Sequence, residues 1–164
     1  MIVIANSSPL IYLSALSDLE LLPKLFREVH IPPAVWREVV DQGGVSPVRA
    51  AVLAAVDRWL RLTQLTSPAE ALVVPGRMLH AGEIEVIRLG EQMHAEALLI
   101  DDRTAVIQAR AMGFRVVPTV AIYIEAKRRG LLLHVMEKVD RLRRAGFRLS
   151  ESDYQSVLAA AGER

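Results

Sequence analysis

Carboxylates occur at three places where short apolar and helical patterns meet. Asp101 and Asp102 follow directly on an apolar run at residues 97–100. Glu38 lies one helical turn after a double proline, and Glu83 opens the helical pattern that precedes the apolar run. Carboxylates gathered at one site repel one another and favour a hard divalent cation such as Mg²⁺ or Mn²⁺, whose bound water can attack a phosphodiester. Helix capping by the same acids is the structural alternative.

The elements that must position these acids alternate along the chain. Short, continuous apolar runs predict strands at 2–5, 29–31, 97–100 and 114–117, each covered on both faces. Helical patterns occupy 8–16, a segment from Ser17, a segment from Pro32, 48–60, 81–93, 102–112, 119–129, 131–145 and 150–160. Strand–helix alternation with short links predicts a three-layer α/β/α fold with a mostly parallel central sheet. Residues 63–80 are expected to form a loop and a short helix.

Two of the predicted helix starts depend on capping residues. Ser8 before Pro9 places a cap residue ahead of a proline at the first helical position. Ser17 and Glu20 form the pattern of a capping box. In the helix at 81–93, Glu83 shares the apolar side, whereas Glu85 is expected on the surface.

The 164 residues, 52% of them hydrophobic, fit one domain spanning residues 1–164. The chain contains no cysteine, which excludes disulfides, thiolate metal sites and a cysteine nucleophile, and fits a reducing cytoplasm. No apolar stretch approaches the roughly 18–20 residues of a membrane-spanning helix. We therefore expect a cytoplasmic protein without a membrane partner.

Charge is distributed unevenly although the total is only +1. Residues 1–100 carry 8 Lys and Arg against 11 Asp and Glu, whereas residues 101–164 carry 12 against 8. Eight of these bases fall between Lys127 and Arg148. The basic stretch is compatible with a polyanionic partner such as RNA, and a solvated helical face is the alternative.

Five short motifs follow one another along the chain: Asn6-Ser7-Ser8-Pro9-Leu10, residues 33–38, residues 82–85, residues 98–103, and Pro118-Thr119 with residues 126–131. In order and spacing they resemble a PIN-domain protein, and more narrowly the uncharacterised prokaryotic PIN subfamily related to VapC-type toxins. The resemblance extends from Ile2 to about Leu158. It implies a PIN-like α/β fold and a metal-dependent ribonuclease.

The resemblance also implies an acidic quartet that binds Mg²⁺ or Mn²⁺. Carried over by position, its members fall on Asn6, Glu38, Glu83 and either Asp101 or Asp102. Ser8 and Thr119 match polar residues that support the site, although Pro118 replaces the usual glycine. Asn6 stands where the family pattern has aspartate, so the site lacks one negative charge and should bind Mg²⁺ more weakly.

Three functional hypotheses remain open from the sequence. The first is an endoribonuclease that resembles the toxin of a toxin–antitoxin pair, forms a homodimer and is bound by a small antitoxin protein. Its candidate RNA-phosphate contacts are Arg103, Lys127, Arg128 and Arg129. The second is a PIN fold that no longer cleaves and serves as an RNA- or protein-binding module, a hypothesis motivated by Asn6.

The third hypothesis is a different α/β protein. A receiver domain places its acidic pair after the first strand, and a dinucleotide binder needs a Gly-x-Gly-x-x-Gly turn, which this sequence lacks.

Aromatic residues make up 5% of the chain, and Tyr12, Tyr123 and Tyr154 are scattered. The sequence therefore shows no stacking platform of the kind that single-strand binders use.

Overall fold

The central sheet is parallel and has four strands. The computed structural model describes residues 1–164 apart from the side chains of Val73 and Val74. The strands are β1 (Ile2–Ala5), β2 (Glu28–Ile31), β3 (Leu60–Leu62) and β6 (Ala97–Leu99), in the order β3-β2-β1-β6. Ile4 pairs with His30 on one side and with Leu98 on the other. The predicted mostly parallel sheet is confirmed.

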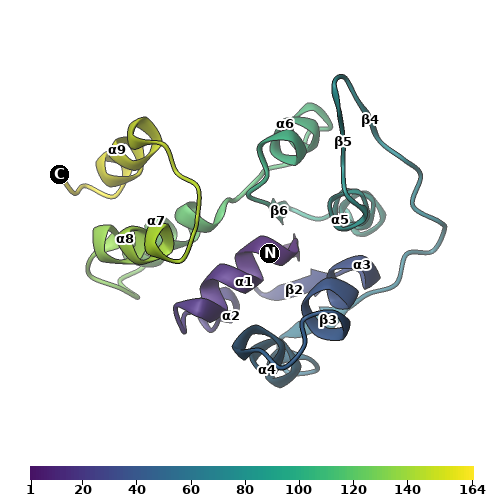
Figure 1. Ribbon diagram of the computed structural model, residues 1–164, viewed down its shortest axis with the longest axis horizontal. Coiled ribbons are helices and arrows are strands. Elements are labelled where there is room, and N and C mark those ends of the chain that lie inside the picture. Colours follow the sequence, from purple (N-terminus) through teal and green to yellow (C-terminus); the bar gives the residue numbers. More distant parts are fainter.

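Helices cover both faces of this sheet. The helices are α1 (Ser7–Ala15), α2 (Leu21–Leu25), α3 (Pro33–Trp36), the π-helix η1 (Arg37–Asp41), α4 (Pro47–Ala55), α5 (Ala81–Met93), α6 (Arg103–Ala111), α7 (Thr119–Arg128), α8 (Val135–Arg144) and α9 (Glu151–Ala160). Helices α1, α2, α4 and α7 lie on one side, and α5 and α6 lie on the other (Figure 1). The predicted three-layer architecture is thus confirmed. Within the described part of the chain, no helix has the length and apolar content needed to cross a membrane.

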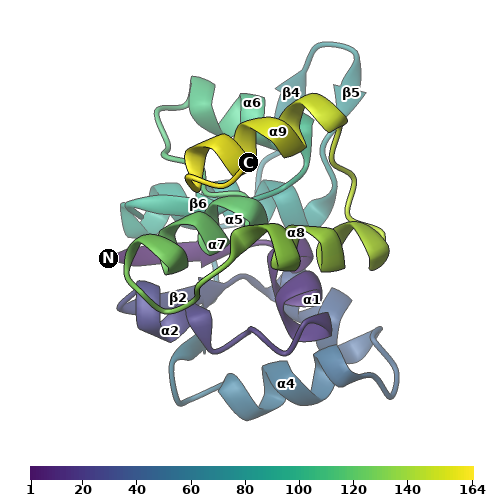
Figure 2. The same cartoon turned by 90° about the vertical axis from the view of Figure 1, so that its left-hand side faces the viewer.

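The C-terminal helices form a separate cluster on the α1 side. Helix α7 packs against α1 and α2, while α8 and α9 pack on α7 and on each other (Figure 2). Val135, Val139 and Leu142 of α8 are fully buried. This arrangement brings the loop between α8 and α9 to the end of the sheet where β1 and β6 finish.

The chain changes direction across the sheet between β1 and β6. After β1 it proceeds to β2 and β3 on one side, and it returns through α5 to place β6 on the other side of β1. Ligands of open α/β sheets bind at such a switch point, outside the carboxyl ends of the strands. The amide of Asn6 donates to the carbonyl of Leu99 at 2.9 Å and so ties the two strand ends together.

Two predicted elements near the sheet are wrong. The predicted strand at 114–117 is reduced to a single bridge between Val116 and Leu98, because Pro118 follows and cannot extend the ladder. The predicted helix at 48–60 ends at Ala55, where Asp57 takes a positive φ of 65° and turns the chain into strand β3. Pairing with β2 outweighs the local helical pattern there.

The structure also differs from the predicted starts of three helices. Ser17 has a φ of 60° and terminates α1 instead of capping a new helix, since its amide donates back to Ser14. The cap of α1 is Asn6 and not Ser8. Helix α8 begins at Val135 instead of residue 131.

Residues 63–80 contain a hairpin instead of the predicted short helix. It pairs β4 (Val73–Val74) with β5 (Arg77–Met78), and Gly76 takes a φ of 80° in the turn. Figure 1 shows this hairpin beyond α5, at the edge of the molecule.

Candidate active site

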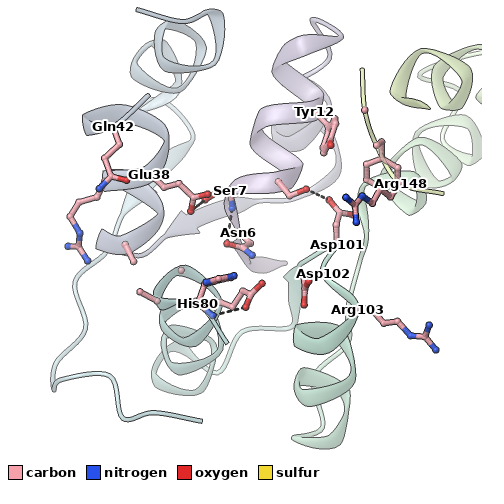
Figure 3. A pocket seen from close by; sticks show the side chains of 18 of the residues that line it. Asn6, Ser7, Tyr12, Glu38, Gln42, His80, Asp101, Asp102, Arg103 and Arg148 are labelled. Carbon is pink, nitrogen blue, oxygen red and sulfur yellow. Dashed lines mark hydrogen bonds between the residues drawn. The ribbon is translucent and has the colours of Figure 1, made fainter. Parts of the chain in front are cut away.

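A cavity of about 950 Å³ opens at the switch point between β1 and β6. Its walls come from α1, the α3–η1 segment, the hairpin, α5, the start of α6 and the α8–α9 loop. The lining residues are Asn6, Ser7, Ser8, Tyr12, Ala34, Arg37, Glu38, Gln42, Arg77, His80, Ala81, Gly82, Glu83, Asp101, Asp102, Arg103, Gly146, Phe147 and Arg148. Figure 3 shows side chains from these separate segments pointing toward one space.

Asn6 lies at the floor of this cavity and is 8% exposed. It follows β1 directly and caps α1, because its Oδ1 accepts a hydrogen bond from the Ser7 amide at 2.9 Å. Aspartate and asparagine both serve this capping role. The fold therefore does not require the neutral side chain, and its presence changes the charge of the cavity without changing the local structure.

Glu38 reaches the cavity from the π-helix η1. A π-helical turn inserts an extra residue into a helix and shifts the directions of its side chains, and such turns are frequent at functional sites. The Ser7 hydroxyl donates to Glu38 Oε2 at 2.7 Å. Ser7 thus links Glu38 to Asn6, a connection that the sequence analysis missed because it singled out Ser8.

Glu83 is buried at the start of α5, with 7% of its surface exposed. It forms a capping box with His80, whose amide donates to Glu83 Oε2 at 2.9 Å. Burial raises the pKa of Glu83, and the nearby negative charge of Asp102 adds to this, while the hydrogen bond from His80 opposes it. Glu83 and Asp102 are therefore close enough to influence each other electrostatically.

Gly82 provides the space in which the oxygens of Asn6 and Glu38 approach α5. A Cβ at this position would lie 3.3 Å from Asn6 Oδ1 and 3.5 Å from Glu38 Oε2. A side chain at residue 82 would therefore crowd these two oxygens. In the sequence, the glycine directly before Glu83 is the signal that indicates this close approach.

Asp101 and Asp102 have different roles although they are adjacent. Both oxygens of Asp101 are engaged: Oδ1 accepts from the Thr119 amide at 2.7 Å, and Oδ2 accepts from the hydroxyls of Thr119 at 2.7 Å and Ser8 at 3.0 Å. Burial raises the pKa of Asp101, and these hydrogen bonds oppose the rise. Asp101 thus joins α1 to α7 at the cavity wall.

Asp102 caps α6 with one oxygen and faces Arg77 with the other. Oδ1 accepts from the Ala105 amide at 3.0 Å, and Oδ2 lies 3.3 Å from Arg77 Nη2. Arg77 also donates to Thr104 Oγ1 at 3.0 Å. The hairpin therefore places the cationic side chain of Arg77 at the acidic cavity. This contribution was not predicted, because residues 63–80 have no clear sequence pattern.

The basic residues of the cavity differ from those predicted. Arg103 lines it as expected, together with Arg37, Arg77 and Arg148. The other predicted phosphate contacts are not among its lining residues. Lys127 pairs with Glu163 at 2.6 Å, and Arg128 and Arg129 pair with Glu125 at 2.6 and 2.7 Å.

Glu85 is not the surface residue that the helical pattern predicts. Its Oε2 accepts from the Ala34 amide at 2.7 Å, and its Oε1 lies 3.6 Å from Arg37. Only 16% of its side chain is exposed. Glu85 therefore holds the start of α3, because the free amides of that first turn need an acceptor.

A family model for a PIN domain, DUF3368, matches residues 2–163. The chain belongs to this PIN-domain family. A solved structure, a PilT N-terminus domain protein SSO1118 from the hyperthermophilic archaeon Sulfolobus solfataricus P2, is similar in fold with a TM-score of 0.55 and 16% identity, covering 74% of this chain and 90% of that one. No curated protein matches the chain significantly.

PIN domains are generally nuclease-like and depend on a divalent metal, and the oxygen donors of this PIN domain fit such an ion. Asn6, Glu38, Glu83 and Asp102 offer carboxylate and amide oxygens to one cavity. Across the residues with described side chains, no group of three or more Asp, Glu or His residues is arranged to hold a metal ion. Mg²⁺ typically uses one or two carboxylates and keeps several waters, so an open donor set of this kind suits it.

Proposed function

We propose that this PIN domain is a metal-dependent endoribonuclease that hydrolyses RNA phosphodiester bonds. The observation that carries the proposal is the shared cavity of Glu38, Glu83 and Asp102 at the β1–β6 switch point. Mg²⁺ or Mn²⁺ bound by one or two of these acids would supply a water of lowered pKa and neutralise charge on the scissile phosphate.

Each acid has a defined part in this proposal. Glu38 and Glu83 offer carboxylate oxygens to the cavity. Asp102 is the fourth acid of the quartet because it accepts one hydrogen bond at 3.0 Å from Ala105 and a longer one at 3.3 Å from Arg77, whereas Asp101 accepts two at 2.7 Å and one at 3.0 Å. Asn6 contributes a neutral amide at the remaining position. Ser7 orients Glu38, while Ser8 and Thr119 hold Asp101.

RNA is the proposed substrate because arginines line the walls around the acids. Arg37, Arg77, Arg103 and Arg148 come from four separate segments and can contact phosphates on both sides of the cleaved bond. The Arg77 side chain is 55% exposed despite its pairing with Asp102, so donors remain for a phosphate. The arginines replace Lys127, Arg128 and Arg129 as proposed contacts.

Cleavage of end-labelled single-stranded RNA tests this function. We expect cleavage in Mg²⁺ or Mn²⁺, none in EDTA, and a loss of about a hundred-fold or more in Glu83→Gln, which keeps the capping-box geometry. Glu91→Gln is the matched control because Glu91 lies on the same helix, outside the cavity, and pairs with Arg88. Equal and negligible cleavage with metal and with EDTA would contradict the proposal.

A toxin-like role, a small antitoxin partner, a homodimer and a cytoplasmic location belong to the same proposal. They are supported by the resemblance of the motifs to VapC-type proteins and, for location, by the absence of cysteine. Leu133, 80% exposed, and Leu131, 40% exposed, offer apolar surface before α8 for a protein contact. Light scattering checks the dimer, and a monomer at micromolar concentration contradicts it.

Asn6 supports one alternative, a PIN fold that binds RNA or protein without cleaving. The side chain is neutral at a position where a carboxylate would attract a cation more strongly. If the natural protein binds RNA in Mg²⁺ without cleaving it, and Asn6→Asp introduces cleavage, the binding module is the better description.

A further inference from the structure

The fold brings together two aromatic rings from opposite ends of the chain at the cavity wall. Tyr12 of α1 and Phe147 of the α8–α9 loop meet edge to face, with ring centroids 5.0 Å apart and planes at 83°. Both residues line the cavity, and both are only partly buried. The sequence alone does not indicate a stacking platform, because these two residues are so widely separated in the chain.

Tyr12 lies near the acidic part of the cavity. It lies one helical turn after Ser8, so the two side chains share a face of α1, and Ser8 donates to Asp101 at 3.0 Å. Figure 3 shows Tyr12 on the same side of the cavity as Asp101 and Arg148. A group that contacts the Tyr12 ring therefore lies about one helical turn from Ser8, in the same cavity as the proposed catalytic acids.

Two arginines line the same cavity as the aromatic pair. Arg148 follows Phe147 directly, and Arg103 begins α6 next to Asp102. Neither arginine forms an ion pair with the acidic side chains that the structure describes. An aromatic surface beside free guanidinium groups matches a nucleotide, which presents a flat base next to an anionic phosphate.

We propose that Tyr12 and Phe147 form a subsite for a nucleobase of single-stranded RNA, next to the phosphate that is cleaved. This inference rests on the proposed function for the identity of the substrate. The base stacks on the aromatic pair, while Arg148 and Arg103 hold its flanking phosphates. An edge-to-face pair leaves ring surface open to the cavity, and stacking of this kind tolerates different bases because every base has a π-face.

Binding measurements in EDTA test the subsite independently of cleavage. The probes are a fluorescent single-stranded RNA of about eight nucleotides and a counterpart with the same phosphates but stable abasic sugars. The natural protein is expected to prefer the RNA with bases. Tyr12→Leu and Phe147→Leu should each weaken its binding about ten-fold, and should change binding of the abasic probe by less than about two-fold.

Three further variants separate stacking from folding. Tyr12→Phe and Phe147→Tyr keep the rings and should keep the preference for bases. Tyr154→Leu removes a ring that packs with Arg143 outside the cavity, and should leave both affinities unchanged. A variant that misfolds loses both probes together, and the ring-preserving variants then decide the outcome.

Two results overturn the subsite. One is a natural protein that binds both probes equally, and the other is a set of ring-removing and ring-preserving variants that all behave alike. Failure of the proposed function is distinguishable, since it appears as absent cleavage in Mg²⁺ while the preference for bases in EDTA persists. Conversely, cleavage without any preference for bases removes the subsite and leaves the nuclease.

Discussion

Thr119 holds Asp101 twice, through its backbone amide to Oδ1 and through its hydroxyl to Oδ2, both at 2.7 Å. Thr119 is fully buried at the start of α7, and Ser8 of α1 donates to the same carboxylate. One acid from the end of the sheet thereby fixes two helices. The geometry of the cavity depends on this junction, because α1 also presents Asn6 and Ser7 to it.

Removing the Thr119 hydroxyl should destabilise the protein. Thr119→Val keeps the shape of the side chain but leaves Asp101 with one fewer donor, which costs about 1–3 kcal/mol in the free energy of unfolding. Thr119→Ser retains the hydroxyl and should lose less than half of that. Urea unfolding followed by circular dichroism gives both values. Equal stability of the two variants would show that the hydroxyl is not the stabilising group.

The sequence predicted the elements whose patterns are local. Continuous apolar runs marked β1, β2 and β6 because all three strands are covered by helices on both faces. Glycines after α6 and α7 marked where those helices end, since Gly113 and Gly130 have φ values of 90° and 72°.

The remaining elements depend on contacts across the molecule. The sequence of β3 has the pattern of a helix end, and it forms a strand because Leu60 pairs with β2. Ser17 matches the pattern of a capping box, but its positive φ excludes that role. In the cavity, the acids were predictable as residue types at the ends of elements. The contributions of Arg77, Tyr12 and Phe147 were not, because each reaches the cavity only through the packing of distant segments.

Asp102→Asn should reduce cleavage while leaving the fold intact. Asparagine caps a helix as well as aspartate does, so α6 keeps its bond from Ala105. The lost negative charge should lower cleavage about a hundred-fold and weaken Mg²⁺ binding measured by calorimetry. Asp153→Asn, a change at an exposed position in the first turn of α9, is the control and should leave both unchanged. Full activity of the Asp102 variant would assign the fourth acid to Asp101.

Asn6→Asp should strengthen metal binding. The new carboxylate keeps the bond from the Ser7 amide and adds a negative charge near Glu38, in the cavity that Glu83 also lines. We expect Mg²⁺ affinity to rise roughly ten-fold or more, because a full charge at contact distance in a partly buried site outweighs a neutral amide. Calorimetric titration with Mg²⁺ measures the change. Asn6→Gln adds bulk without charge, and a similar gain in that variant would rule out the electrostatic explanation.

Glu163 should make stability depend on acid pH. Its carboxylate accepts from Lys127 at 2.6 Å and from the amides of Val135 and Met136 at 2.7 and 2.8 Å, which joins the C-terminus to α7 and the start of α8. Burial favours the neutral form, but the bonds from Lys127 and the two amides outweigh it and lower the pKa of Glu163 to about 2.

The stabilisation from Glu163 is therefore complete above the ordinary pKa of 4.5 and is lost as the pH falls from there toward about 2. At pH 7, Glu163→Gln should reduce the free energy of unfolding by about 2 kcal/mol, and the difference from the natural protein should shrink below pH 4.5. Urea unfolding at pH 7 and pH 3 measures both. Glu151→Gln, at a side chain 67% exposed, should change stability by less than about 0.5 kcal/mol at either pH. A constant difference between Glu163→Gln and the natural protein across this range would mean that the ionised carboxylate is not what holds α8.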